Sequence, residues 1–311
     1  MCSVFGLIDH NSVLNAKEKN RMLGVLSHEC EVRGTDATGI AYNYNGRLRI
    51  YKRPLAAHKL RFRIPNGVNV IMGHTRMTTQ GDAKKNYNNH PWLGKTEHAQ
   101  FALAHNGVLW NDDELRSQLP KTTVETDSYV AVQLLEQNKT LDFDGLKNMA
   151  ETVEGSFVFT VLDDADNLFF VVGNNPLTIF RYEGFDLYAS TADILRKAVR
   201  RLQLGKPNEI LKPEEGEILR IDRNGHITRG SFIPHHTFSH WWRNAPYYGS
   251  YLLEDTSLET DYLIDAAKAM GISEDEVQAL LDYGCTTDEI EELLYDPALL
   301  HELTSELLYA Y

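Results

Sequence analysis

The order of strand-like and helix-like segments most constrains what this chain can fold into. Alternating or continuous apolar runs bounded by turn residues predict strands, and apolar spacings of three and four predict helices. Strands are expected at residues 4–8, 38–44, 47–53, 68–72, 101–104, 157–162, 168–172, 178–182 and 187–189, and helices at 17–29, 127–137, 142–151 and after a cap at Ser190 or Thr191. Many antiparallel strands with helices in separate blocks favour an α+β fold, with two stacked sheets flanked by helices.

The chain begins Met1-Cys2-Ser3, so removal of the initiator methionine would leave a cysteine as the amino terminus. The α-amine of such a residue has a reference pKa of about 7.7–8.0 and can take the proton from its own thiol. Nucleophile and base then need no second segment of chain. A cysteine at this position can equally be a small buried hydrophobe, so position alone leaves both interpretations open.

Composition and charge exclude several classes of protein. The 311 residues are 42% hydrophobic and 24% charged, as in a globular chain with one large domain and a small appendage. No apolar run approaches the ~20 residues of a membrane span, the start lacks a secretion signal, and a cytoplasmic protein is expected. Cys2, Cys30 and Cys285 lie far apart and are odd in number, which predicts neither a disulfide framework nor a metal pair.

The net charge of −13 is unevenly distributed along the chain. Residues 254–311 hold 16 acidic residues and one base, Lys268, which gives −15, and the remaining 28 acids and 30 bases give +2 for residues 1–253. Phosphate binding needs clustered Lys and Arg, so nucleic acid is not an expected partner. The acidic segment could face a basic protein surface or be a solvated helical appendage.

Three polar groups between the predicted elements suit chemistry on a carboxylate or an amide. Arg76 stands alone among small hydroxyl residues, where its fork-shaped cation could face a carboxylate. Asn106 has a side-chain amide and Gly107 an unshielded N–H, and together they could point two donors at an oxyanion. Each signal is weak alone, because Asn-Gly is usually a turn, Arg76 could be a surface charge, and His90 before a proline is usually structural.

The order of these groups along the chain resembles the class II glutamine amidotransferases. This N-terminal-nucleophile family includes the glutaminase domains of glucosamine-6-phosphate synthase, amidophosphoribosyltransferase and asparagine synthetase. The motifs that carry the resemblance are Met1-Cys2-Ser3-Val4-Phe5-Gly6, Arg33-Gly34-Thr35-Asp36-Ala37-Thr38-Gly39, Gly73-His74-Thr75-Arg76, Asn89-His90-Pro91, His105-Asn106-Gly107-Val108 and Glu125-Thr126-Asp127-Ser128. The resemblance extends from Cys2 to about Thr228, and it implies a four-layer αββα Ntn-hydrolase sandwich.

The resemblance assigns a role to each matching residue. It implies that Cys2 attacks the side-chain amide of glutamine, with its α-amine as base, and that Asn106 and Gly107 form the oxyanion hole. Arg76 would hold the substrate α-carboxylate and Asp127 its α-ammonium.

The resemblance also implies supporting residues. Thr79, with Thr78, and His90 would shape the substrate pocket. A second group would support the nucleophile from nearby: Arg33, Gly34 and Asp36. No metal and no cofactor is implied. The sequence departs from the family pattern at Thr35, Met77 and Gln80, in lid-like loops, which puts loop closure in doubt more than hydrolysis.

Two segments follow the family domain, which is expected to span residues 1–231. Residues 232–253 form an aromatic connector that could pack on the main domain or dock a partner, and its His236 and His240 have a metal-like spacing without further ligands. Residues 254–311 predict short acidic helices, because Ser273 to Glu276 and Thr286 to Glu289 have the capping-box pattern. This pattern weakly resembles small helical protein-binding modules.

The sequence therefore predicts a glutaminase whose ammonia acceptor is a separate synthase protein, because residues 232–311 carry no glycine-rich phosphate loop and no second catalytic cluster. Glutamine is the expected small-molecule partner, a homo-oligomer is possible, and neither nucleic acid nor a membrane is expected. Two alternatives remain open. One is an Ntn amidohydrolase acting on a larger γ-glutamyl conjugate, and the other is a catalytically silent binding module.

Overall fold

The computed structural model describes residues 2–235, 263–264, 267–268, 271–282, 285, 290, 293–294, 300–301 and 304–305. The chain divides into two compact units, Met1–Arg243 and Asn244–Tyr311. Most of the predicted aromatic connector, including His236 and His240, lies outside the residues that the structure describes. No helix among the described ranges is long and apolar enough to cross a membrane.

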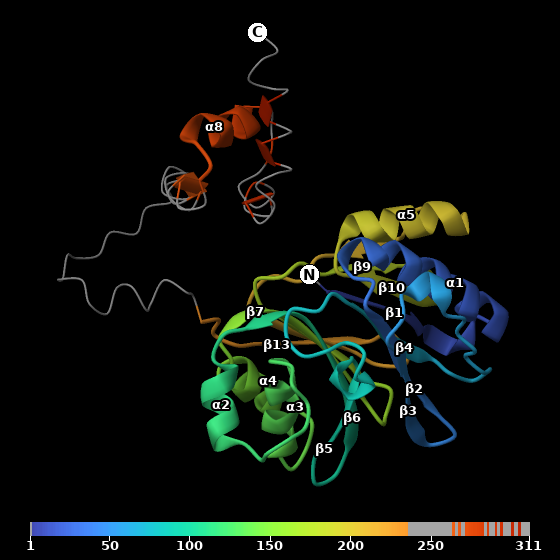
Figure 1. The fold of residues 1–311 in the computed structure, drawn as a ribbon. Helices are drawn as coiled ribbons and strands as arrows, with labels where there is room; N and C mark the ends of the chain where they lie inside the picture. The colour runs from blue at the N-terminus through green and yellow to red at the C-terminus, as the bar shows by residue number, and fades with distance from the viewer. Residues whose placement is uncertain are drawn as a thin grey trace. The chain divides into compact units, whose positions relative to one another are not determined.

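Two antiparallel sheets form the centre of the first unit (Figure 1). In spatial order, the first sheet contains β11 (Glu209–Leu211), β9 (Thr178–Arg181), β10 (Phe185–Ala189), β1 (Ser3–Asp9), β4 (Val70–Arg76), β2 (Ala37–Tyr44) and β3 (Arg47–Arg53). The second sheet contains β13 (Ile227–Ser231), β12 (Glu217–Ile221), β8 (Leu168–Val172), β7 (Gly155–Asp163), β6 (Gln100–Leu109) and β5 (Trp92–Lys95).

Helices cover the outer face of each sheet, which confirms the αββα sandwich. On the first sheet lie α1 (Ala16–Glu29) and α5 (Ala192–Leu202), and on the second lie α2 (Asp112–Gln118), α3 (Tyr129–Glu136) and α4 (Phe143–Ala150) (Figure 1). Side chains alternate between the two faces of a strand. In β1, Phe5 and Leu7 join the apolar cluster under α1 and α5, while Val4 and Ile8 join the cluster between the sheets.

The position of β1 brings the start of the chain into the interior. All seven residues of β1 are buried, and the strand pairs with β10 on one side and β4 on the other. Ser3 lies opposite Thr75 in this antiparallel pairing. The register therefore carries Cys2 to the end of β4, beside Arg76.

Several elements differ from the sequence-based expectation. The strand expected at 101–104 extends from Gln100 to Leu109, so Asn106 and Gly107 lie inside β6, and the interpretation of this pair as a turn between elements is wrong. The polar residues extend the strand because β7 pairs with it along the whole length. Helix α2 and strand β5 were not predicted from the sequence. The hairpin through Asn45-Gly46 is confirmed, and both residues have positive φ, as a tight hairpin turn requires.

The second unit contains α8 (Glu274–Asp282), which starts at a confirmed capping box. Ser273 Oγ accepts a hydrogen bond from Glu276 N (3.3 Å), and Glu276 Oε2 accepts one from Ser273 N (2.9 Å). An apolar cluster joins α8 to its neighbours in this unit, and its members include Val277, Leu280, Ile290 and Leu294. The second predicted capping box, Thr286 to Glu289, lies outside the described residues.

Candidate active site

A narrow cavity with about 10 Å³ of free space lies where β1 and β4 meet the loop before α3. Six of the sequence-predicted site residues line it: Cys2, Arg76, Thr79, His90, Gly107 and Asp127. The other lining residues are Met77, Gln80, His105, Thr126 and Ser128. The four remaining predicted residues do not line this cavity: Arg33, Gly34, Asp36 and Asn106.

The Cys2 thiol is buried and faces the segment that follows β4. Its Sγ donates a hydrogen bond to the carbonyl oxygen of Met77 at 3.4 Å. Burial raises the pKa of this thiol above its ordinary value, because a thiolate there would be poorly solvated. A nucleophilic Cys2 consequently needs a base that takes its proton at the moment of attack.

Arg33, Gly34 and Asp36 hold the backbone around the nucleophile. Arg33 Nε donates to the carbonyl oxygen of Cys2 at 3.0 Å. A Cβ on Gly34 would lie only 2.4 Å from the carbonyl carbon of Arg76, so the close approach of these two backbones requires glycine. Asp36 N donates to Arg76 O (2.9 Å), and the Asp36 carboxylate accepts from Thr78 N (2.8 Å). These contacts fix the chain on both sides of Arg76.

The Arg76 guanidinium is 2% exposed and held by uncharged acceptors. Its Nη1 donates to Asn89 Oδ1 (2.7 Å), and its Nη2 donates to the carbonyl oxygens of Gln80 (2.5 Å) and Gly81 (3.1 Å). Burial lowers the pKa of Arg76, but a guanidinium stays protonated in proteins. A guanidinium has five donor hydrogens, so these three bonds leave capacity for a substrate carboxylate.

The Asp127 carboxylate provides the opposite charge in the same cavity. Its Oδ2 accepts from Leu109 N at 2.7 Å, and its Oδ1 accepts from Ser128 Oγ at 3.2 Å. A carboxylate has about four lone-pair sites, so two bonds orient Asp127 and leave acceptors toward the cavity. A cavity with one fixed cation and one fixed anion suits a zwitterion.

Gly107 and Asn106 occupy neighbouring positions of β6. Gly107 has φ of +143°, and a Cβ there would lie 1.9 Å from Ser156 O, so only glycine fits. The Asn106 side chain is fully buried, and neither its Oδ1 nor its Nδ2 has a hydrogen-bond partner among the described residues. Buried amides are normally paired, so an unpaired one next to a cavity suggests a partner that binds there.

Two buried histidines, His90 and His105, line the cavity. His90 is buried, its ring centroid lies 3.9 Å from those of His74 and Trp92, and burial lowers its pKa well below the ordinary value. His105 Nδ1 lies 2.7 Å from Ser128 Oγ, and this hydroxyl donates a hydrogen bond to the Asp127 carboxylate. His105 belongs to a matching motif but has no role predicted from the sequence. Its signal was the strand alternation that places it on the same face of β6 as Gly107.

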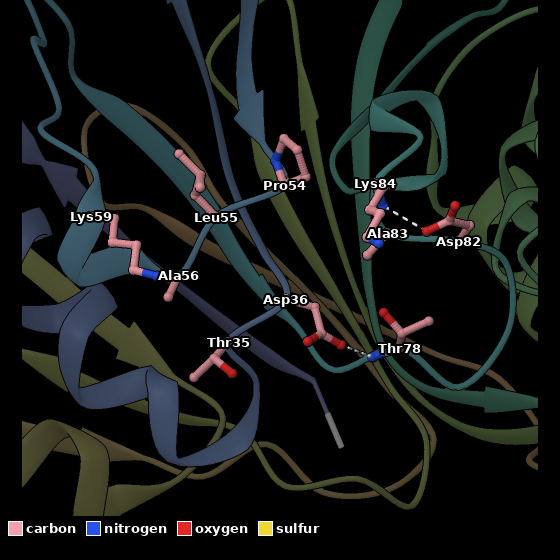
Figure 2. A pocket seen from close by; sticks show the side chains of 10 residues that line it. All are labelled: Thr35, Asp36, Pro54, Leu55, Ala56, Lys59, Thr78, Asp82, Ala83 and Lys84. Atoms are coloured by element: carbon pink, nitrogen blue, oxygen red, sulfur yellow. Dashed lines mark hydrogen bonds between the residues drawn. The ribbon is translucent and has the colours of Figure 1, made fainter.

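A second, larger pocket of about 420 Å³ lies on the other side of the segment 77–79 (Figure 2). Thr78 lines this pocket, whereas its neighbours Met77 and Thr79 line the Cys2 cavity. Figure 2 shows the Asp36–Thr78 hydrogen bond in its wall, with Lys59 and Lys84 from opposite sides. Among the described ranges, no cluster of three or more His, Cys, Asp or Glu could hold a metal ion.

Known proteins are similar to this chain in sequence and in fold. Residues 74–197 match the family of glutamine amidotransferase domains. The chain is 29% identical over 249 residues to the isomerizing glutamine–fructose-6-phosphate aminotransferase of Staphylococcus aureus. This match covers 75% of this chain and 39% of that enzyme. The Staphylococcus epidermidis enzyme of the same name is 29% identical over 239 residues, a match that covers 73% of this chain and 38% of that enzyme.

Residues 74–197 of this chain therefore resemble a glutamine amidotransferase domain. Solved structures agree in fold: the B. subtilis glutamine phosphoribosylpyrophosphate amidotransferase, in complex with ADP and GMP, has a TM-score of 0.58 at 23% identity, covering 75% of this chain and 49% of that one. A structure of the allosteric regulatory enzyme of purine biosynthesis has a TM-score of 0.60 at 22% identity, with the same coverage. The chain thus shares the fold of these two enzymes over about three quarters of its length. It spans about two fifths of the length of the curated relatives it matches.

Proposed function

We propose that this chain hydrolyses the side-chain amide of glutamine to glutamate and ammonia, with Cys2 as nucleophile. The observation that carries this proposal is the convergence of Cys2, Arg76, Asp127 and Gly107 on one cavity. Arg76 would bind the α-carboxylate of glutamine and Asp127 its α-ammonium. These two contacts would select the free amino acid over a plain amide and would point its side chain at Cys2.

The chemical steps follow from these positions. The α-amine of Cys2 takes the thiol proton while the sulfur attacks the amide carbon, and the carbonyl oxygen becomes an oxyanion. Asn106 Nδ2 and the Gly107 N–H would donate to that oxyanion, and losing one such donor commonly costs ~10²–10³ in rate. The C–N bond then breaks, the α-ammonium returns its proton to the leaving ammonia, and a thioester remains. Water activated by the same amine hydrolyses the thioester to glutamate and restores the thiol.

This mechanism requires a free amine on Cys2, and so the removal of Met1. An amide nitrogen in its place would have no lone pair for the proton. The raised pKa of the Cys2 thiol makes the base more important, because little thiolate exists without it. A reduced thiol is also needed, which is why we propose the cytoplasm as the compartment.

We further propose that a separate protein uses the ammonia. The support is the sequence of residues 232–311, which carries no phosphate-binding loop and no second catalytic cluster. The matched relatives are longer than this chain. A purified chain that releases all its ammonia into solution, rather than into a product of its own, would agree with this proposal.

The test is glutamate production by the wild type, by Cys2→Ala and by Cys285→Ala. Cys285 is a thiol of the second unit and is the matched control. We expect Cys2→Ala to remove all hydrolysis and to keep the circular dichroism of the wild type, while Cys285→Ala stays active. Hydrolysis by the Cys2 variant would refute the mechanism. An inactive wild type with normal phenotypes in the Cys2 variant would favour a silent binding module.

A γ-glutamyl conjugate hydrolase is the second candidate, and the pocket of Figure 2 favours it. The segment 77–79 contributes lining residues to both that pocket and the Cys2 cavity, so the amine part of a larger substrate would extend toward this pocket. Turnover of γ-glutamyl amides without turnover of glutamine would select this candidate over a glutaminase.

A further inference from the structure

The segment Asn89-His90-Pro91 is held by two residues that face each other on neighbouring strands. Gly39 of β2 and Lys52 of β3 are register partners. Lys52 Nζ donates to the carbonyl oxygen of Asn89 (2.5 Å) and to that of Pro91 (2.9 Å). The ammonium therefore bridges the two carbonyls on either side of His90.

Gly39 permits this segment to approach the sheet. A Cβ at Gly39 would lie 2.1 Å from His90 O and 2.8 Å from Pro91 Cδ, so any side chain there must displace the segment. Lys52 Nζ also lies 5.7 Å from the centre of the Trp92 ring, within reach of a cation–π contact. Gly39 thus leaves space for the segment 89–91 to approach the sheet, and Lys52 holds the segment there with its charged ammonium.

The segment carries two parts of the glutamine cavity. Asn89 Oδ1 accepts from Arg76 Nη1 at 2.7 Å, and Asn89 Nδ2 donates to Ala83 O at 2.8 Å. His90 lines the cavity, and both of its ring nitrogens are buried without a partner in the described part of the chain. A displaced segment would therefore move the acceptor that orients Arg76 and the wall beside the substrate.

We propose that Gly39 and Lys52 together set the affinity of the site for glutamine, by seating Asn89 against Arg76 and His90 in the cavity wall. Both act as positioning residues, because neither lines the cavity. This inference rests on the proposed glutaminase function. It adds two residues that do not contact the substrate but determine the KM for glutamine.

Titration of Lys52 gives the inference a pH signature. Burial, and then the charge of Arg76 facing it from β4, lowers the pKa of Lys52 to about 8. His90 also lies beside it, and burial keeps His90 neutral, while the Trp92 ring that it contacts does not titrate. Above pH 8 the amine keeps N–H donors but loses the charge that strengthens its bonds to the two carbonyls.

The experiment measures KM and kcat for glutamine between pH 7 and 9.5 in the wild type, Lys52→Met, Lys52→Arg and Gly39→Ala. At pH 7 we expect Lys52→Met and Gly39→Ala to raise KM by ~5- to 100-fold, the range for unpaired buried carbonyls, with kcat changed by less than about threefold. Lys52→Arg should restore most of the affinity. Arg49→Met, an exposed residue of the same strand, is the matched control and should match the wild type.

The KM ratio of Lys52→Met to wild type should fall as the pH rises past 8, because only the wild type loses a charge, and it should stay above 1, because the neutral amine still donates to the two carbonyls. The α-amines of Cys2 and of glutamine titrate in the same range, but they are common to both proteins and cancel in the ratio. A ratio independent of pH, or an unchanged KM in folded Lys52→Met, would overturn the inference and leave the glutaminase function intact. If Lys52→Met prevents folding, KM is measured for Lys52→Gln and Gly39→Ala instead, and an unchanged KM in both folded variants would overturn the inference. A wild type that does not hydrolyse glutamine would overturn both.

Discussion

Replacing Asp127 with Asn tests how the cavity recognises a free amino acid. The two side chains have the same shape, and the amide oxygen can keep the bond from Leu109 N, while the amide nitrogen can donate to Ser128 Oγ. The fold should therefore survive. The variant loses the negative charge that would face the α-ammonium of glutamine. A hydrogen bond to a charged group contributes ~1.5–3 kcal/mol, which corresponds to about 10- to 150-fold in kcat/KM.

The assay compares glutamine with glutaramic acid, which is glutamine without its α-amino group. The wild type should prefer glutamine by about this factor, and Asp127→Asn should reduce the preference to near 1. Asp163→Asn is the matched control, because Asp163 is a buried carboxylate that accepts from Ala165 N and Asn167 N and does not line the cavity. An unchanged preference in Asp127→Asn would refute the assignment of Asp127 to the ammonium.

Two further predictions concern stability. Gly107→Ala should lower the free energy of unfolding by more than about 2 kcal/mol in urea denaturation, because its methyl group would meet Ser156 O at 1.9 Å and φ is +143°; an unchanged midpoint would contradict the backbone described for β6. Burial lowers the pKa of His74 to about 3, whereas an unfolded histidine titrates near 6.5, so the unfolded state binds the extra proton between these values. The stabilising contribution of neutral His74 should therefore be fully present above pH 6.5. Below that pH, the free energy of unfolding should fall by up to ~1.4 kcal/mol per pH unit because of this residue. Equal slopes for the wild type and His74→Gln between pH 6.5 and 4 would exclude this cause.

The sequence predicted the layers and most of the cavity because both depend on local signals. The alternation in β1 and the Asn45-Gly46 turn specify strands and a hairpin from nearby residues alone. The ordered motifs predicted the six lining residues by resemblance. They did so without any information on distance.

The elements that were missed depend on contacts distant in sequence. Strand β6 continues through Asn106 and Gly107 because β7 pairs with it, and a local pattern of polar residues followed by glycine favours a turn instead. Likewise, Lys52 looks like an ordinary surface lysine of a hairpin, and only the packing of the segment 89–91 against β2 and β3 gives it a role.

Intact-protein mass spectrometry tests the central claim most directly. The purified chain is mixed briefly with glutamine, quenched in acid, weighed and then digested. We predict a chain without Met1, and a transient adduct with the mass of glutamine minus ammonia on the peptide that begins with Cys2. An active chain that retains Met1, or an adduct on any other peptide, would contradict the account.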